Sequence, residues 1–255
     1  MRIDLNCDMG ESFGAYTIGA DAAVMASISS ANVACGYHGG DPAVMRRTVR
    51  LAREAGVAVG AHPGFQDLAG FGRREMRLDP QEIEDMVLYQ VGALAAIARS
   101  EGVRLQHVKA HGALYNMAAM DRALADAIAR AVAAFDRSLM LFGLPNSELI
   151  RAGNACGLRV VSEGFADRAY EPDGSLTPRS RAGAVIHDTE AVVQRAVRMA
   201  VDGRVAAIDG AEIVMDVETI CTHGDTPGAQ ALTRALRAGL ERAGVAIAPV
   251  AGPPR

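Results

Sequence analysis

Length, composition and charge already narrow the class of protein. The chain has 255 residues, of which 50% are hydrophobic and 22% are charged. This composition predicts a folded protein with a sizeable core and excludes a disordered chain, which has few apolar residues and a high net charge. The formal net charge of −4 gives no general attraction to nucleic acid or to an anionic membrane, so we expect neither as a partner.

The cysteines and the first residues indicate a reducing compartment. Cys7, Cys35, Cys156 and Cys221 lie far apart and form no C-x-x-C pair, so we expect free thiols, packed as small core residues, and no zinc ribbon. The sequence has no signal-peptide core at its start and no apolar run of the roughly 18 residues that a membrane span needs. We therefore expect a soluble, cytoplasmic protein.

Short apolar runs alternate with longer helical patterns along the chain. The predicted strands cover residues 2–7, 32–35, 57–61, 105–110, 139–142, 158–162 and a segment within 212–221, with an eighth strand or edge piece at 245–248. The dipeptide Asp-Pro starts two predicted helices, over 41–56 and 79–102, because aspartate caps a helix and proline suits its first position. Glycine ends both, and further helices are expected over 123–134 and 226–244.

This alternation predicts an α/β fold with a parallel sheet covered by helices. About seven strand–helix units without an evident linker favour a single closed or nearly closed (β/α) barrel over residues 1–255, and about 250 residues is the usual size of such a barrel. The alternative is an open doubly wound sheet, although no Gly-x-Gly-x-x-Gly pattern follows the first strand. Residues 167–182 are polar and contain two prolines, which predicts a long ordered loop or lid.

Polar side chains lie on two strands that ought to be apolar. Side chains point alternately to the two faces of a strand, and the outer face of a parallel barrel must be apolar because it meets helices. Both polar stripes should therefore point inward. Burying these groups is unfavourable in free energy unless they are paired or hydrated, so we expect them to be paired, hydrated or part of a functional site. The stripes are Asp4, Asn6 and Asp8 on the first strand and His107, Lys109 and His111 on the fourth.

Five strand ends carry an acidic residue or a histidine that is followed closely by glycine. Active sites of α/β barrels lie at the carboxyl ends of the strands, and glycine lets the backbone turn sharply and approach a ligand. We therefore expect these ends to form one functional site. The five residues are Asp8, His38, His62, His111 and His223.

Other polar residues are expected to be structural. Asp4 should make a structural hydrogen bond at the base of the barrel, the end that serves stability rather than catalysis. His107 and His187 are expected to be hydrogen-bonded core histidines. Of the basic pair Arg73 and Arg74, one could bind an anionic group.

Two kinds of chemistry fit the clustered residues. Asp8, His38 and His62 could hold a divalent ion that activates water, although a ligand signature such as H-E-x-x-H is absent. Alternatively, a carboxylate could act as the base on water while Lys109 and a histidine stabilise the developing oxyanion. The residues leave both alternatives open.

Longer blocks of the sequence resemble the LamB/YcsF family, the family of 5-oxoprolinase A subunits. They run in the order of that family over nearly the whole chain. The blocks are DLNCDMGE at 4–11, ANVACGYHGGDP at 31–42, GAHPGF at 60–65, DLAGFGRR at 67–74, VKAHGALYN at 108–116, EGFADRAY at 163–170 and CTHGD at 221–225.

The resemblance implies a seven-stranded (β/α) barrel of the glycoside hydrolase/deacetylase type. It also implies an activity, the opening of the lactam ring of 5-oxo-L-proline (pyroglutamate) to L-glutamate, with ATP as the co-substrate. Two partner subunits, which resemble the halves of an allophanate hydrolase or a kinase-inhibitor-like protein, would complete the enzyme. The P-loop pattern is absent from this sequence, so the residues do not indicate which subunit binds ATP.

We assign water addition and ring opening to this chain. Asp8 or Asp225 would be the base, and Lys109 would stabilise the phosphoryl and oxyanion charge together with a histidine. The candidate catalytic residues are Asp8, Lys109, His111, His223 and Asp225. The candidate substrate-binding residues are Asn6, Glu11, His38, His62 and Arg73.

Two other functions stay open at this point. One is a metal-dependent deacetylase or sugar-amide hydrolase, and the other is a non-catalytic carbohydrate-binding or scaffolding subunit. We expect little or no activity from the isolated chain, because a nucleotide-phosphorylation motif is absent from its sequence.

Overall fold

The computed structural model describes residues 1–223 and 228–250, and within them seven parallel strands close into a barrel. The barrel strands are β1 (Arg2–Met9), β2 (Ser30–Ala34), β3 (Ala58–His62), β4 (Leu105–Val108), β5 (Met140–Gly143), β6 (Arg159–Phe165) and β9 (Thr219–His223). Each strand pairs with the next in this order, and the pairing of β9 with β1 closes the barrel. The predicted seven-stranded barrel is therefore confirmed, and the open doubly wound sheet is excluded.

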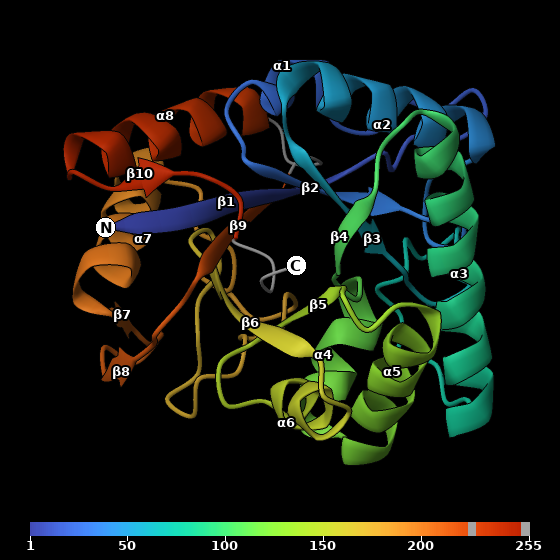
Figure 1. Cartoon of the computed structure of the whole chain (residues 1–255). Helices are drawn as coiled ribbons and strands as arrows, with labels where there is room; N and C mark the ends of the chain where they lie inside the picture. The colour runs from blue at the N-terminus through green and yellow to red at the C-terminus, as the bar shows by residue number, and fades with distance from the viewer. Residues whose placement is uncertain (224–227, 251–255) are drawn as a thin grey trace.

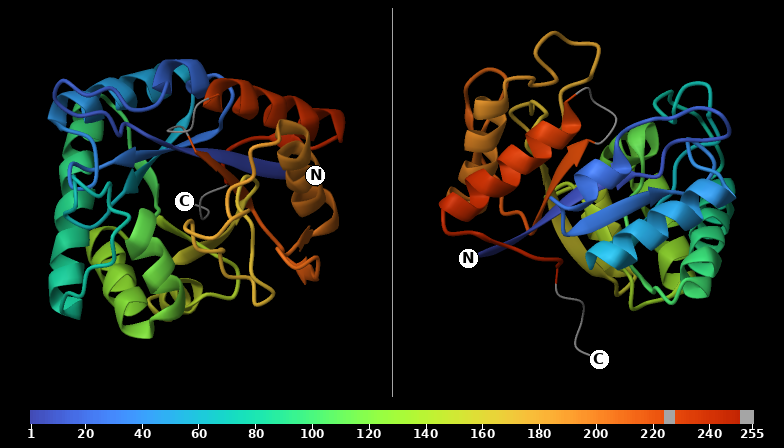
Figure 2. Two further views of the ribbon diagram at one scale, coloured as in Figure 1. Left: turned by 180° about the vertical axis from the view of Figure 1, so that it is seen from behind. Right: turned by 90° about the horizontal axis from the view of Figure 1, so that it is seen from above.

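Helices follow the strands and cover the outside of the barrel (Figure 1). They are α1 (Asp21–Met25), α2 (Pro42–Ala55), α3 (Pro80–Ser100), α4 (Gly112–Met120), α5 (Arg122–Phe135), α6 (Glu148–Ala155), α7 (Thr189–Asp202) and α8 (Ala229–Arg242). Figure 2 shows the same arrangement from two further sides. The short strand β10 (Ala246–Ile247) pairs with the start of β1, at the amino end of the barrel.

The two Asp-Pro helix starts are confirmed. Asp41 accepts hydrogen bonds from the N–H groups of the first turn of α2, and Gly56 ends this helix with a φ of 69°. Asp79 forms a capping box with Glu82 at the start of α3, which satisfies N–H groups that lack a partner within the helix. The predicted start of the last helix at residues 226–227 lies outside the described residues, and α8 ends at Arg242.

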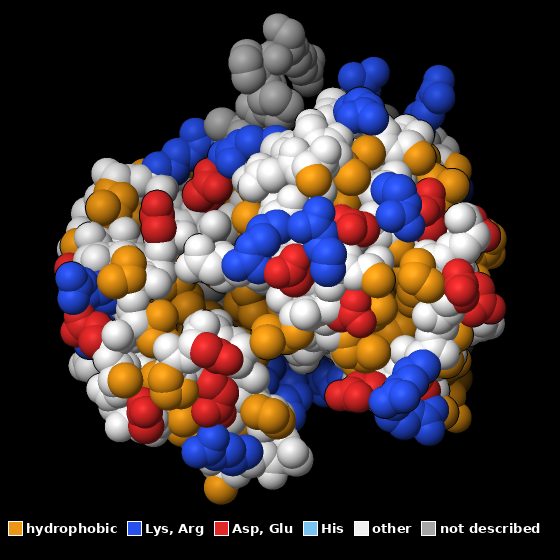
Figure 3. All heavy atoms as spheres, turned by 90° about the horizontal axis from the view of Figure 1, so that it is seen from below, with side chains coloured by type: hydrophobic (Ala, Val, Ile, Leu, Met, Phe, Trp, Pro, Cys, Tyr) orange, Lys and Arg blue, Asp and Glu red, His pale blue; other side chains and the backbone are white. Residues whose placement is uncertain are grey.

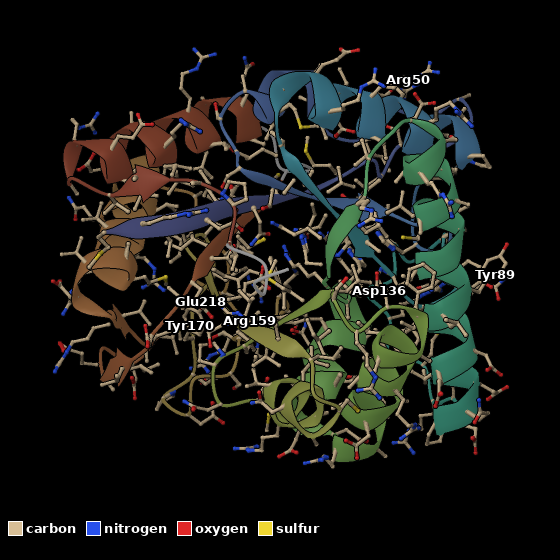
Figure 4. The ribbon with its side chains drawn as sticks, in the orientation of Figure 1. Arg50, Tyr89, Asp136, Arg159, Tyr170 and Glu218 are labelled. Carbon is tan, nitrogen blue, oxygen red and sulfur yellow. The ribbon has the colours of Figure 1, made fainter. Side chains whose placement is uncertain are left out.

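The predicted seventh strand is two different strands. Its last residues belong to β9, whereas its first residues form β8 (Glu212–Val214), which pairs antiparallel with β7 (Arg204–Ala206) outside the barrel. Each strand of this hairpin has three residues, too few for an alternation of apolar and polar residues to show in the sequence. Next to β9, Glu218 forms an ion pair with Arg159 of β6 (Figure 4).

The core is divided between the outside and the inside of the barrel. The odd-numbered side chains of β1 are buried in one large hydrophobic cluster, which includes residues from Ile3 to Val245. A second cluster fills the base of the barrel. It consists of Met140, Phe142, Val161 and Val250. The even-numbered polar residues of β1 face the barrel interior above this second cluster, as the alternation of side chains predicted.

Residues 166–188 connect β6 to α7 and contain no helix. Two isolated bridges, from Arg168 to Val185 and from Tyr170 to Leu176, order this segment. The buried hydroxyl of Tyr170 accepts a hydrogen bond from the N–H of Phe165 at 2.6 Å. The predicted loop at 167–182 lies here, and its action as a lid stays a prediction.

The outer surface carries both signs of charge. Acidic and basic side chains are mixed across the face shown in Figure 3, and Arg50 and Tyr89 point outward from α2 and α3 (Figure 4). None of the described helices is long and apolar enough to cross a membrane. All four cysteines have free thiols, as expected.

Candidate active site

Asp4 ties three strands together inside the base of the barrel. Its carboxylate accepts hydrogen bonds from the hydroxyls of Ser29 at 2.6 Å, Ser30 at 2.7 Å and Thr219 at 2.6 Å. Burial raises the pKa of Asp4 above its ordinary value, although these hydrogen bonds oppose the shift. The structural role predicted for Asp4 is therefore confirmed.

Asn32 and His107 form the next layer. The Asn32 amide donates to Asn6 Oδ1 at 2.6 Å and to Asp8 Oδ1 at 2.9 Å, and Asn32 Oδ1 lies 2.7 Å from His107 Nε2. The His107 ring stacks on Phe142, with 4.1 Å between the ring centroids. Burial, together with the positive charge of nearby Lys109, lowers the pKa of His107 to about 3, so its ring is neutral. His107 is a hydrogen-bonded core residue, as predicted.

Lys109 is the centre of the buried charges. Its ammonium lies 2.9 Å from Asp8 Oδ1, 3.0 Å from Glu163 Oε1 and 2.9 Å from Cys221 Sγ. Burial by itself lowers the pKa of Lys109, but Asp8, Cys221 and Glu163 together hold it well above its ordinary value. The chain thus fixes an ammonium ion between two carboxylates, with the Phe165 ring centroid 5.2 Å away.

Glu163 and the contact of Cys221 with Lys109 were not predicted from the sequence. Glu163 is fully buried and also accepts a hydrogen bond from the Asn6 amide at 2.9 Å. The predicted strand ended at Ser162, so the inward alternation stopped one residue short. Cys221 is a buried core residue, as expected, and its sulfur in addition contacts Lys109. Burial raises the pKa of the Cys221 thiol well above its ordinary value, which keeps it neutral.

Three histidines lie above this centre, at the carboxyl ends of the strands. His62 Nε2 is 3.3 Å from Asp8 Oδ2 and 2.9 Å from His111 Nδ1. The His38 and His111 rings are stacked, with 3.6 Å between their centroids. Glu11 Oε1 lies 3.3 Å from His38 Nε2 and 3.5 Å from His111 Nδ1. Burial and the neighbouring histidines lower the pKa of His38 and of His111 well below the ordinary value.

The close packing of these rings depends on glycine at position 72. Its φ is +62°, and a Cβ there would lie 2.7 Å from His38 Cβ and 2.8 Å from His111 Cδ2. Only glycine adopts this backbone conformation readily and leaves this space. Position 72 thus lets the loop after β3 close over the histidines.

The histidine cluster could hold a metal ion. One ligand atom from each of four buried residues lies within 4.8 Å of the others, and these residues are Glu11, His38, His62 and His111. The sequence had suggested His38 and His62 together with Asp8. In the structure Asp8 binds Lys109 beside the cluster, and Glu11 and His111 complete the group instead.

A cavity of about 660 Å³ opens over the site, within the range of roughly 300–1,000 Å³ that small-molecule sites occupy. Asp8, Lys109, His62 and His111 line its floor, and the loop at 167–182 lines one wall. Three arginines border it. These are Arg73, Arg168 and Arg179. Burial and then the charge of Arg179 lower the pKa of Arg168 to about 10, so basic side chains crowd this wall.

The structure brings most of the predicted site residues together. Those that converge are Asn6, Asp8, Glu11, His38, His62, Lys109 and His111, and Arg73 lines the cavity above them. Asn6, Glu11 and His38 do not line the cavity among the described residues. The backbone of His223 pairs with Asp8, whereas the His223 side chain and Asp225 lie outside the described residues.

The structure also decides the expectations for His187 and for the arginine pair at 73 and 74. His187 is exposed, so its prediction as a core histidine was wrong. Arg74 forms a salt bridge with Asp67. Arg73 is therefore the member of the pair that faces the cavity, where its guanidinium lies 4.8 Å from the Phe71 ring centroid.

The fold and this site define a seven-stranded (β/α) barrel with a buried carboxylate–ammonium centre beneath a cavity at the carboxyl ends of its strands. The model of the LamB/YcsF family matches residues 3–254, and the chain belongs to this family. The A subunit of 5-oxoprolinase from Symbiobacterium thermophilum is 60% identical over 246 residues, which cover 96% of this chain and 94% of that protein.

Solved structures agree with the fold. The crystal structure of the lactam utilization protein from Thermus thermophilus has a TM-score of 0.93 and 51% identity, covering 97% of this chain and 99% of that one. The polysaccharide deacetylase Bc1974 from Bacillus cereus has a TM-score of 0.50 and 13% identity, covering 97% of this chain and 92% of that one. This second likeness concerns the fold alone.

Proposed function

We propose that the chain is the A subunit of a 5-oxoprolinase, which opens 5-oxo-L-proline to L-glutamate at the expense of ATP. The relatives named as 5-oxoprolinase A subunits and as a lactam utilization protein support this activity. The observation in this chain that carries it is the Asp8–Lys109–Glu163 centre, whose Asp8 and Lys109 face a cavity large enough for a five-membered lactam and a phosphoryl group. Two further subunits and a cytoplasmic location are part of the proposal.

The chemistry explains a need for ATP. A lactam is a stabilised amide and a poor electrophile, and a five-membered ring closes again readily. Phosphorylation of the amide oxygen makes the ring carbon more electrophilic and places a phosphoryl group on that oxygen. In this proposal the transfer from ATP takes place in the assembled enzyme, and the absence of a P-loop pattern from this sequence leaves open which subunit binds the nucleotide.

Asp8 is placed to act as the base for water addition. It borders the cavity, its Oδ1 is held by Lys109 and Asn32, and its Oδ2 faces His62. As water adds to the activated ring carbon, Asp8 takes its proton. The bond between this carbon and the ring nitrogen then breaks, the nitrogen takes up a proton, and the resulting acyl phosphate is hydrolysed by a second water to glutamate and phosphate.

Positive charge beside Asp8 stabilises the oxygens that become negative in this sequence. The Lys109 ammonium is fixed before the substrate arrives, so it does not need to reorganise during the reaction. Arg73, Arg168 and Arg179 suit the phosphoryl group and the substrate carboxylate, because a guanidinium matches both in geometry. Asn6 is fully buried and acts as a positioning residue through Lys109 and Glu163.

A divalent ion is compatible with the cluster beside this centre. Neither ring nitrogen of buried His38 has a hydrogen bond within the described part of the chain, and imidazole and carboxylate are the usual donors to such an ion. Glu11, His38, His62 and His111 would hold it. When bound, the ion would supply Lewis-acid polarisation and attract anionic groups.

The direct experiment measures glutamate released from 5-oxoproline by the chain together with its two partner subunits, with and without ATP. The proposal predicts release only when ATP and the partners are present. Release that needs neither ATP nor the partners would contradict it.

Metal-dependent amide hydrolysis is the second candidate, because the His/Glu cluster favours it. It predicts cleavage of an amide substrate that depends on a metal and not on ATP. A non-catalytic scaffold would instead show altered complex assembly, with unchanged chemistry, when Asp8 is replaced.

A further inference from the structure

Two histidine nitrogens face each other at the centre of the cluster. His62 Nδ1 lies 2.8 Å from the carbonyl oxygen of Lys109, and His111 Nε2 lies 2.8 Å from the carbonyl oxygen of Phe71. Because a carbonyl oxygen only accepts, each of these nitrogens must carry the proton. The remaining nitrogen of a neutral ring is then an acceptor. The two remaining nitrogens are His62 Nε2 and His111 Nδ1, which lie 2.9 Å apart.

Further lone pairs point at the same space. Asp8 Oδ2 lies 3.3 Å from His62 Nε2, and Glu11 Oε1 lies 3.5 Å from His111 Nδ1 and 3.3 Å from His38 Nε2. All of these side chains are buried. Buried acceptors that face one another are unfavourable unless a positive charge lies between them. The geometry therefore favours a cation at this point.

We propose that Glu11, His38, His62 and His111 bind one divalent transition-metal ion. Their ligand atoms lie within 4.8 Å of one another, close to the separation of at most about 4.4 Å that bonds of roughly 2.0–2.2 Å to a single ion allow. The two carbonyl contacts are the usual support of metal-binding histidines, whose second nitrogen donates to a backbone oxygen and fixes the tautomer. Three imidazoles and one carboxylate favour zinc, cobalt, nickel or iron over magnesium and calcium.

The inference does not depend on the proposed reaction, because binding is measured on the chain alone. The protein, without a polyhistidine tag, is stripped with a chelator and titrated with Co²⁺ near neutral pH. The visible absorption of bound Co²⁺ and elemental analysis after dialysis report the stoichiometry. We expect one Co²⁺ per chain, displaced by Zn²⁺.

Variants then locate the ion. His62→Gln and His111→Gln should each weaken Co²⁺ binding by at least about 100-fold, since even the loss of a supporting group costs 10- to 100-fold. The matched control is His187→Gln, a change at an exposed histidine that should leave binding unchanged. Circular dichroism verifies that each variant is folded, and Glu11→Gln replaces any histidine variant that is not.

Several results would overturn the inference. The wild-type chain could fail to bind Co²⁺ or Zn²⁺ in a saturable way, or folded cluster variants could bind as tightly as the wild type. The protein could also take up no metal and show ¹⁵N resonances of an imidazolium at His62 or His111. A proton shared between the two rings would then occupy the position proposed for the ion. A negative outcome leaves the proposed lactam reaction to be judged by its ATP requirement.

Discussion

Two buried carboxylates depend on the ammonium of a single lysine. Lys109 lies 2.9 Å from Asp8 and 3.0 Å from Glu163, and its side chain is 2% exposed. Lys109→Met keeps most of the apolar stem of the side chain but leaves both carboxylates without this partner. The free energy of unfolding should fall by about 3–5 kcal/mol, the usual cost of breaking a buried ion pair. Chemical denaturation measures it.

The control for this change is Arg237→Met. Arg237 pairs with Glu241 on the surface of α8, where the two side chains are 33% and 50% exposed. Such pairs contribute about 0–1 kcal/mol. Equal losses for the two variants would show that the Lys109 contacts contribute no more than a surface pair.

His107 makes stability depend on pH. Its folded pKa of about 3 lies below the ordinary value of 6.5, so below pH 6.5 the unfolded chain binds a proton that the folded chain does not. The stability contribution of the neutral ring is therefore complete above pH 6.5 and is lost as the pH falls towards 3. Between about pH 6.5 and about pH 5, the wild type should lose about 1.5 kcal/mol more than His107→Gln. Denaturation curves that shift equally with pH in both proteins would contradict this.

At the scale of the elements, β3 packs against β4 at a glycine, which leaves room for a side chain of β4. Gly60 pairs with His107, and a Cβ at Gly60 would lie 2.1 Å from His107 Nε2. Gly60→Ala should therefore destabilise the barrel by about 1–3 kcal/mol, the cost of overpacking a core. Gly92→Ala is the matched control, because it lies within α3 with only Phe135 at 4.0 Å. That change should stabilise the chain by about 0.5–1 kcal/mol, as thermal denaturation would show. Similar losses in both variants would argue against the clash.

Local signals in the sequence were sufficient to predict the two helices that begin with Asp-Pro. Asp41 and Asp79 predicted the starts of α2 and α3, because the first N–H groups of a helix need hydrogen-bond acceptors. The helices α1, α4, α6 and α7 were not predicted, and two of them have few residues to form a pattern, with five in α1 and eight in α6. The β7–β8 hairpin was missed for the same reason.

Across the whole molecule, alternation along β1 predicted which side chains enter the barrel, but not which of them touch. Lys109 reaches Asp8 across 101 positions of the sequence and Cys221 across 112. Such contacts follow from strand order and register, which only the closed barrel fixes. The sequence therefore indicated that Asp8 and Lys109 share a site, whereas the bond of Lys109 to Glu163 and the pairing of Glu11 with the histidines required the structure.

The central claim is that the centre formed by Asp8 and Lys109 adds water to an activated lactam. The most direct test compares ATP-dependent glutamate formation by the reconstituted enzyme carrying Asp8→Asn with that of the enzyme carrying Asp136→Asn, a change at an exposed aspartate after α5. Asp8→Asn should lower turnover by about 10²- to 10⁴-fold, the usual contribution of a general base, while Asp136→Asn keeps wild-type turnover. Wild-type turnover in the folded, assembled Asp8→Asn enzyme would contradict the claim.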